Sequence, residues 1–139
     1  MLNTQKMDYG LAIMMTMGMR AGERLSSKDL AEAAQVSRGF ALKIVRQLAA
    51  AGLLVAKRGV KGGVDLAKPI EDITLYDILS ASGSNGATDL CVSVHKARAL
   101  HRLLRPVQKM LDAELSAITL AKLVKEQRRI DAKKAKAKA

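Results

Sequence analysis

The sequence contains few of the side chains from which catalytic and metal sites are usually built. Its 139 residues include one Cys, two His, one Phe, two Tyr and no Trp. A single Cys excludes an internal disulfide framework and any metal site made of Cys alone within one chain. The sequence also offers no Ser-His-Asp or Cys-His set, no paired carboxylates on one helix face and no complete phosphate-binding loop. We therefore predict that the chain is not an enzyme.

Long hydrophobic runs are also missing. Residues 7–19 are apolar, but these 13 residues are interrupted by Asp8, Gly10 and Gly18 and are too short to span a bilayer. Residues 1–6 lack the basic start and apolar core of a secretory signal peptide. We expect a cytoplasmic protein without membrane contact, in which residues 7–19 form a buried first helix.

Positive charge is abundant and unevenly distributed. The formal net charge is +11. Residues 1–68 carry 11 Lys and Arg against 5 Asp and Glu, residues 69–124 carry 6 against 6, and residues 125–139 carry 7 against 2. The excess therefore lies in the first half and in the tail, as expected for a chain that binds a polyanion with one part of its surface.

Residues 26–52 carry the signals of two short helices in succession. Ser26 can cap the first helix, and Asp29, three residues on, can complete a capping box. Ser37 can cap the second helix, which should end at Gly52. Two capped helices joined by a tight turn predict a helix-turn-helix.

The second of these helices has one apolar face and one basic face. The apolar positions recur at helical spacing and should face the core; they are Ala41, Ile44, Val45 and Leu48. The basic face suits a helix in the major groove of DNA, with Arg38 placed to read a guanine and Leu42 to meet a thymine methyl. An ordinary solvated basic face is the alternative. The predicted DNA contacts on this helix are Ser37, Arg38, Gly39, Leu42, Lys43 and Arg46.

A Gly-rich hairpin is predicted directly after this helix. Two short β-prone runs within residues 53–66 flank a tip of three glycines and several cations. A hairpin that follows a recognition helix is typical of a wing, and Arg58 and Lys61 are placed to enter a minor groove or bind phosphate. A nucleotide-binding loop is the alternative, but no Gly-Lys-Ser/Thr ending and no following helix support it.

Short motifs along the chain resemble those of a group of bacterial regulators. They are Asp8-Tyr9-Gly10-Leu11, Val36-Ser37-Arg38, the Gly-rich segment 58–66 and residues 73–78. In this order they resemble the winged-helix transcriptional regulators IscR, NsrR, RirA and CymR over about residues 2–124, and within that group the motifs look closest to NsrR, the nitric-oxide-sensing repressor. The resemblance implies a homodimeric transcription factor that binds double-stranded DNA and is often controlled by an iron–sulfur cluster.

The C-terminal half carries a long apolar stripe near heptad spacing. One small winged domain does not need so long a stripe for its own core, so we interpret it as a dimerisation surface; packing back onto the helix-turn-helix is the alternative. Pro106 interrupts the stripe and should kink the helix or start a new segment. A last short helix should begin near Ile118. The predicted dimerisation residues are Leu100, Leu103, Leu104, Val107, Leu111 and Leu115.

These features predict a mainly α-helical fold with a small β-hairpin, arranged as a winged helix-turn-helix with a long C-terminal dimerisation helix. We expect residues 1–82 to form the DNA-binding domain. Residues 83–124 should hold the remnant of a sensor loop and the dimerisation helices. Residues 125–139, rich in Lys and Ala, should form a basic tail that is disordered or only loosely helical.

The sequence supplies few ligands for the cluster that the resemblance implies. Relatives place three cysteines around the position of Cys91, and the counterparts of the second and third are missing here. Asp8 stands where some relatives complete the ligand set, so Asp8 and Cys91 are the candidate redox or metal residues, with a structural Cys91 as the alternative. We therefore expect no iron–sulfur cluster as a cofactor.

The combined features predict a homodimeric DNA-binding regulator, a repressor of a palindromic operator in an iron, redox or nitric-oxide stress response. Its control stays open between a protein partner or small effector, a redox switch at Cys91, and a variant that has lost its ligands. A non-specific architectural DNA-binding protein is the alternative function, and sequence preference discriminates between the two.

Overall fold

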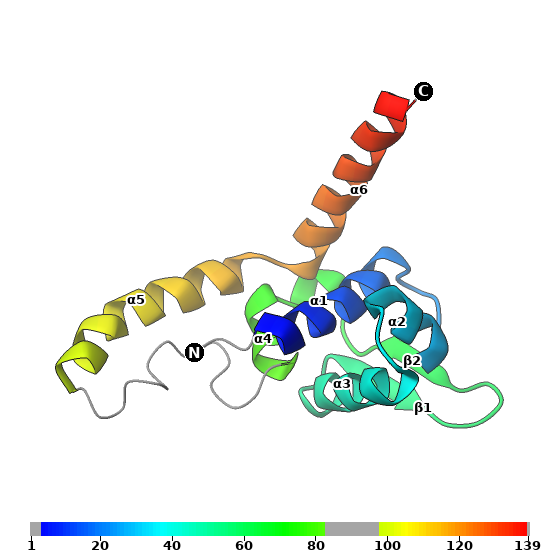
Figure 1. Ribbon diagram of the computed structural model, residues 1–139, viewed down its shortest axis with the longest axis horizontal. Helices are drawn as coiled ribbons and strands as arrows, with labels where there is room; N and C mark the ends of the chain where they lie inside the picture. Colours follow the sequence, from blue (N-terminus) through cyan, green and yellow to red (C-terminus); the bar gives the residue numbers. More distant parts are fainter. Residues whose placement is uncertain (1–3, 83–97, 139) are drawn as a thin grey trace.

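Figure 1 shows the computed structural model, which describes residues 4–82 and 98–138 of the chain. The described elements follow in the order α1 (Thr4–Met19), α2 (Ser27–Ala34), α3 (Arg38–Ala50), β1 (Leu54–Lys57), β2 (Gly63–Leu66), the 3-10 helix η1 (Ile70–Asp72), α4 (Leu75–Ser82), α5 (Arg98–Ala117) and α6 (Leu120–Lys138). The predicted fold class, mainly α-helical with one two-stranded hairpin, is confirmed. No helix within these residues is long and apolar enough to cross a membrane.

The two helices of the helix-turn-helix begin and end where the sequence predicts. The Ser26 hydroxyl accepts from the Asp29 N–H at 3.1 Å, and the Asp29 carboxylate accepts from the Ser26 N–H at 3.1 Å. α2 ends at Ala34, and its C-cap Gln35 has a left-handed backbone with φ of 56°. The Ser37 hydroxyl then accepts from the Phe40 N–H at 3.2 Å and starts α3. Each cap satisfies a donor that the helix start would otherwise leave without a partner.

α1 is the helix around which the core is built. Its Ile13, Met14 and Met17 are at most 1% exposed, so the predicted buried first helix is confirmed. α1 contacts α2, α3, α4 and α6. Those four helices and Ile73, just before α4, contribute further side chains to the core. They include Leu30, Ile44, Leu48, Ile78, Leu120 and Val124.

Two glycines let neighbouring helices approach α1 closely. A Cβ at Gly10 would collide with the side chain of Ser82, a fully buried residue of α4. A Cβ at Gly18 would lie 2.8 Å from Val124 Cγ2 and 3.1 Å from Leu120 Cγ, both in α6. The spacing of α1 from α4 and from α6 therefore depends on the absence of a side chain at these positions.

The wing is joined to the segment that leads into α2. β1 and β2 pair antiparallel, with Lys57 opposite Gly63 at the tip end. Leu25 adds a bridge on the other side of β2: its N–H donates to the Val64 carbonyl at 3.1 Å, and the Val64 N–H donates to the Leu25 carbonyl at 2.7 Å. Leu25 and Val64 are 1% and 3% exposed, so this junction is part of the core.

The first turns of α6 also belong to the core, although the sequence assigns them to the second domain. Leu120 and Val124 are 0% and 2% exposed. Backbone bonds tie the start of α6 to the start of α4: the Leu75 N–H donates to the Ile118 carbonyl at 2.8 Å, and the Leu120 N–H donates to the Ile73 carbonyl at 2.7 Å. The core formed by residues 4–82 is therefore completed by a segment that follows α5 in the chain.

The C-terminal tail is the main correction to the predicted secondary structure. α6 runs from Leu120 to Lys138, so the last helix is longer than the short one expected, and residues 125–138 are helical and not disordered. Ala and Lys favour helix, and the sequence has no Gly or Pro after Pro106. The docked first turns supply a nucleus from which such a segment continues as helix.

α5 also continues where a break is expected. It passes through Pro106 as one helix, so no new segment begins there. Proline removes the donor for the carbonyl of Arg102, but both residues are exposed, which leaves that carbonyl accessible to water. Figure 1 shows α5 extending away from the helices around α1, in contact with α4.

Candidate nucleic-acid interface

α3 is held with one face buried and the other open. The buried positions are at most 1% exposed; they are Ala41, Ile44, Val45 and Leu48. Tyr9 of α1 meets Phe40 of α3 edge to face, with ring centroids 5.4 Å apart and an interplanar angle of 83°. These contacts set the rotation of α3 about its own axis. The predicted buried face is confirmed, and the basic residues are left on the other side.

The open side of α3 carries the residues that the sequence predicts to contact DNA. Leu42 is half-buried and the others are exposed: Ser37, Arg38, Gly39, Lys43 and Arg46. A Cβ at Gly39 would meet no atom within 4 Å, so the fold does not require glycine there. The first turn of α3 thus has a bare, exposed backbone at Gly39.

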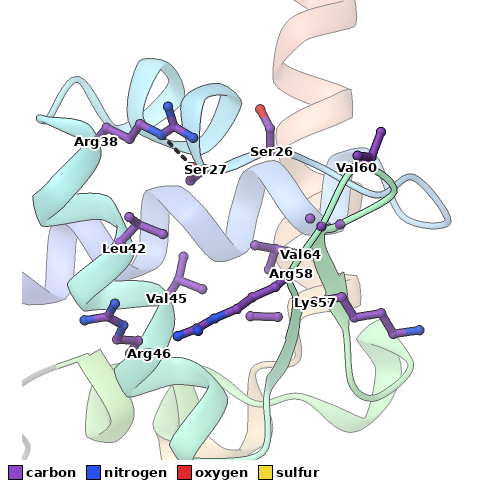
Figure 2. A pocket seen from close by; sticks show the side chains of 14 residues that line it. Ser26, Ser27, Arg38, Leu42, Val45, Arg46, Lys57, Arg58, Val60 and Val64 are labelled. Atoms are coloured by element: carbon purple, nitrogen blue, oxygen red, sulfur yellow. Dashed lines mark hydrogen bonds between the residues drawn. The ribbon is translucent and has the colours of Figure 1, made fainter.

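A groove of about 540 Å³ lies between the start of α2, the open side of α3 and the wing (Figure 2). Arg38, Leu42 and Arg46 line it from α3, and Arg58 lines it from the wing. In Figure 2 the Arg58 side chain extends from the wing toward α3. Half of the predicted DNA contacts therefore share one groove. The other half lie outside its lining: Ser37, Gly39, Lys43 and Lys61.

Three polar lining residues are not among the predicted contacts. Lys57 directly precedes Arg58, and this basic pair in the sequence could have identified Lys57 as a further contact. Ser26 and Ser27 also line the groove. Their sequence pattern indicates a helix cap, and nothing in that pattern shows that the start of α2 faces the wing.

The groove is electropositive. Its lining includes four Lys and Arg side chains and no Asp or Glu. Asp29 follows the lining residues of α2, but its carboxylate is engaged in the cap: the Ser26 backbone N–H, followed by the Ser26 hydroxyl, holds the pKa of Asp29 below its usual value. The surface is thus arranged for a polyanion, not for a cation.

Arg38 is fixed at one end of the groove. Its Nε donates to Ser27 Oγ at 2.9 Å, the bond drawn as a dashed line in Figure 2. This bond ties the first turn of α3 to the first turn of α2. A guanidinium already held in one orientation loses less conformational entropy when a ligand arrives.

The tip of the wing depends on glycine. Gly59 has φ of +105°, which a residue with a side chain rarely adopts. The Gly62 N–H donates to the Gly59 carbonyl at 2.9 Å and closes the turn. A Cβ at Gly62 would lie 2.7 Å from that same carbonyl oxygen. Between them Val60 is fully exposed, so the tip projects beyond the rest of the hairpin.

A second surface lies on α5. Leu100, Leu103 and Val107 are 43%, 73% and 47% exposed, and no residue of α5 is buried. Met110 is not among the predicted dimerisation residues, yet it continues this uncovered strip at 69% exposure. Its spacing of three residues from Val107 was the signal for it. The remaining predicted residues are half-buried: Leu104, Leu111 and Leu115.

The structure places one of the two candidate redox or metal residues. Asp8 is exposed on α1. Cys91 lies outside residues 4–82 and 98–138, so a joint site for the two stays a prediction.

Comparisons with known proteins agree with this arrangement of helix, groove and wing. CymR (YrzC), described as the global cysteine regulator of B. subtilis, matches with a TM-score of 0.70 and 27% identity, over 87% of this chain and 94% of CymR. IscR of T. potens matches with a TM-score of 0.68 and 29% identity, over 88% and 85% of the two chains. CymR of Staphylococcus aureus matches with a TM-score of 0.67 and 28% identity, over 86% and 94%.

A capped recognition helix, a cationic groove and a glycine-tipped wing define a winged-helix DNA-binding transcriptional regulator, and not an enzyme. The pattern that characterises the Rrf2 family, described as iron-dependent transcriptional regulators, matches residues 3–126. The chain belongs to the Rrf2 family. The resemblance to its members IscR and CymR is thereby confirmed, while the resemblance to NsrR in particular stays a prediction.

Proposed function

We propose that the protein acts as a homodimeric repressor that reads a palindromic operator in a response to iron, redox or nitric-oxide stress. The observation that carries the proposal is the uncovered apolar strip on α5, which accompanies a single open recognition helix in each chain. The family description and the named relatives support the class of regulator.

The strip on α5 supports a symmetric pair. Full burial of one large aliphatic side chain is worth about 1.5–3 kcal/mol, and Leu103 and Met110 are the most exposed members of the strip at 73% and 69%. Two copies related by a two-fold axis can cover the same strip on each other. Such a pair presents two copies of α3 in inverted orientation, and a palindrome mirrors that symmetry with half-site centres about 34–36 Å apart.

In this proposal α3 enters the major groove of each half-site and the wing follows the adjacent minor groove. Arg38 and Leu42 face base edges, while Lys43 and Arg46 bind the phosphates beside them. Arg58 enters the minor groove, whose negative potential is enhanced in A·T-rich DNA. A DNA strand lying in the cationic groove between α3 and the wing connects the two sets of contacts.

The residues of this chain do not fit the iron–sulfur cluster that the family description suggests. Clusters are held mainly by Cys thiolates, about four per cluster, and each chain has one Cys. A homodimer would supply two thiolates. Asp8 adds an exposed carboxylate on α1. We therefore propose DNA binding that does not need a cluster, with the Cys91 thiol, a small effector or a partner protein as the signal.

Selection from a random-sequence DNA pool, followed by sedimentation of the protein with the enriched site, tests the DNA-binding proposal. We expect an inverted repeat bound by two chains and preferred over bulk DNA by a factor on the order of 10³ or more. Enrichment of no sequence would instead favour an architectural DNA-binding protein, for which the basic second half of α6 offers a suitable surface. One chain bound per site would contradict the dimer.

Anaerobic purification with iron and sulfide assays and a visible spectrum tests the cluster-free part. We expect colourless protein that binds the selected site. Stoichiometric iron and sulfide in a coloured protein would contradict the proposal, and Asp8 with His95 or His101 would become the first ligands to test beside Cys91.

A further inference from the structure

Arg24, in the turn between α1 and α2, reaches across to the wing and bonds to it at two places. Its Nη2 lies 2.9 Å from Asp65 Oδ2, and its Nε lies 3.2 and 3.1 Å from the two oxygens of that carboxylate. Its Nη1 donates to the carbonyl of Lys61 at 2.7 Å. One guanidinium thus spans strand β2 and the tip of the hairpin, with the planar fork geometry that arginine provides.

The path of the Arg24 side chain is kept open by a glycine. A Cβ at Gly63 would lie 2.6 Å from Arg24 Cγ and 2.9 Å from the Leu25 carbonyl oxygen. Any larger residue at this position would push the aliphatic part of Arg24 away from β2. The sequence of the wing is therefore fitted to an arginine that lies against it.

The bond to the Lys61 carbonyl holds the tip of the wing, which has few other contacts with the rest of the chain. The Leu25–Val64 bridge secures β2 near its middle, but the tip projects beyond it with Val60 fully exposed. A hairpin end with few buried contacts opens locally at a low free-energy cost, and a side chain from outside the hairpin can raise that cost. Arg24 supplies such a hold from the same turn that leads into the cap of α2.

We propose that Arg24 is a positioning residue that fixes the wing relative to α3 for DNA binding, with Asp65 as its anchor. The proposal rests on the proposed DNA-binding function. It accounts for the one acidic residue in the otherwise basic hairpin segment 53–66: Asp65 holds Arg24, and Arg24 neutralises Asp65.

The competing explanation is that Arg24 itself contacts a phosphate, and the two explanations predict opposite signs for one variant. If Arg24 contacts DNA, then Asp65→Ala releases the guanidinium, removes a negative charge and strengthens binding. If Arg24 positions the wing, then Asp65→Ala weakens binding although it removes a negative charge.

The experiment compares Arg24→Ala, Asp65→Ala and the double variant with a matched control. Arg20→Ala removes one cation from the same turn, where Arg20 pairs with Glu23 at 2.6 Å and not with the wing. The probe is the DNA site that the wild-type protein enriches from a random pool, measured by affinity and by hydroxyl-radical footprinting of the minor groove. Hydrogen exchange at the Gly62 and Gly63 amides reports on the wing without DNA.

We expect Arg24→Ala to lower operator affinity by about tenfold and Asp65→Ala by about fivefold, since a misaligned wing loses its minor-groove contact. The double variant should bind no worse than Arg24→Ala, because both substitutions remove the same Arg24–Asp65 interaction. Arg20→Ala should cost about twofold or less. In the footprint of Arg24→Ala, protection of the minor groove by the wing should weaken while protection of the major groove persists. The wing amides should exchange faster than in wild type in Arg24→Ala but not in Arg20→Ala.

Tighter or unchanged binding by Asp65→Ala, or equal losses for Arg24→Ala and Arg20→Ala, would overturn the proposal. Unchanged exchange at the wing amides would overturn it as well, whatever the DNA result. Failure of the wild-type protein to enrich any site would count against the proposed function instead, and the exchange measurement would still decide whether Arg24 holds the wing. The side chains of Arg24 and Asp65 are 38% and 31% exposed, so both variants should fold, which thermal unfolding checks.

Discussion

α3 and α5 are both amphipathic helices, but the chain treats their apolar faces in opposite ways. On α3 the four core-facing apolar residues are at most 1% exposed, and the side left open carries basic and polar residues with the half-buried Leu42. On α5 no residue is buried, and the most exposed side chains include Leu103 at 73% and Met110 at 69%. The core-facing apolar side of α3 is thus covered within one chain, whereas the apolar strip of α5 is not.

The difference indicates what each helix lacks. α3 suits a polar, negatively charged partner, because its open side carries Arg38, Lys43 and Arg46 and the helix contains no Asp or Glu. α5 needs an apolar partner, because an exposed strip of aliphatic side chains in water is unfavourable in proportion to its area. In the proposed function a second copy of α5 covers the strip and DNA binds the open side of α3. The two helices would then divide assembly from recognition.

The largest expected effect comes from breaking the strip on α5. Leu103→Glu places a charge in the proposed dimer contact and should leave monomers at micromolar concentration in sedimentation. Operator affinity should then fall by roughly 100-fold or more, because each half-site must be bound independently. Ser116→Glu is the matched control, since Ser116 is exposed and lies on the opposite side of α5 from the strip. A Leu103→Glu protein that remains a dimer would place the interface elsewhere.

The next effect sharpens the account of α3. Arg38→Ala should cost about 1–3 kcal/mol at the preferred site and relax the preference at one base position, because its guanidinium is held toward the groove. Lys43→Ala should instead weaken binding to all sequences and reduce the salt slope by about one unit. Repeated selection with each variant checks this. An unchanged preferred site for Arg38→Ala would show that α3 lies differently on the DNA.

A smaller effect separates two helical glycines that look alike in the sequence. Gly18→Ala places a methyl against Val124 Cγ2, 2.8 Å away, and should destabilise the fold by about 1 kcal/mol net. Gly39→Ala meets no atom within 4 Å and should stabilise the fold by up to about 1 kcal/mol. It should nevertheless weaken operator binding several-fold, since the methyl would stand between α3 and the DNA backbone. Denaturant unfolding and binding on the same preparations measure both. Stronger binding by Gly39→Ala would contradict the close approach.

Local signals predict the helix-turn-helix well because they act within a few residues. Ser26 with Asp29, and Ser37 with the backbone of Phe40, form the caps that the sequence indicates. The buried face of α3 follows from helical spacing alone. The wing can be predicted from its glycines, because Gly59 and Gly63 have positive φ and Gly62 has no room for a Cβ. These conformational requirements appear in the sequence as a Gly-rich segment.

Contacts between distant segments are less visible in the sequence. Nothing near Leu120 shows that α6 returns to pack on Gly18 of α1, more than 100 positions earlier. Arg24 and Asp65 are 41 positions apart, and each alone looks like an ordinary surface charge. The structure of the tail is difficult to predict for a different reason. Its Lys/Ala segment has no apolar stripe that would indicate a packed helix, yet its residues have high helix propensity and continue a helix whose first turns pack in the core.

The second half of α6 provides the smallest effect, and it separates charge from packing. Arg128 Nη2 donates to the Met19 carbonyl at 3.3 Å, and the described residues beyond it are all exposed. Figure 1 shows this part of α6 projecting away from the end of the molecule that carries α3 and the wing. Removal of residues 131–139 should therefore leave thermal stability unchanged.

DNA affinity should nevertheless fall a few-fold at low salt and converge with that of the full chain as salt rises, because the lost term is unscreened attraction. Replacement of the four lysines after Asp131 by glutamine is the matched control, since it keeps the length and the helix but removes the charge. Both variants should behave alike. A loss of stability on truncation alone would show that this half of α6 packs against the chain or its partner, and would extend the surface of assembly from α5 to α6.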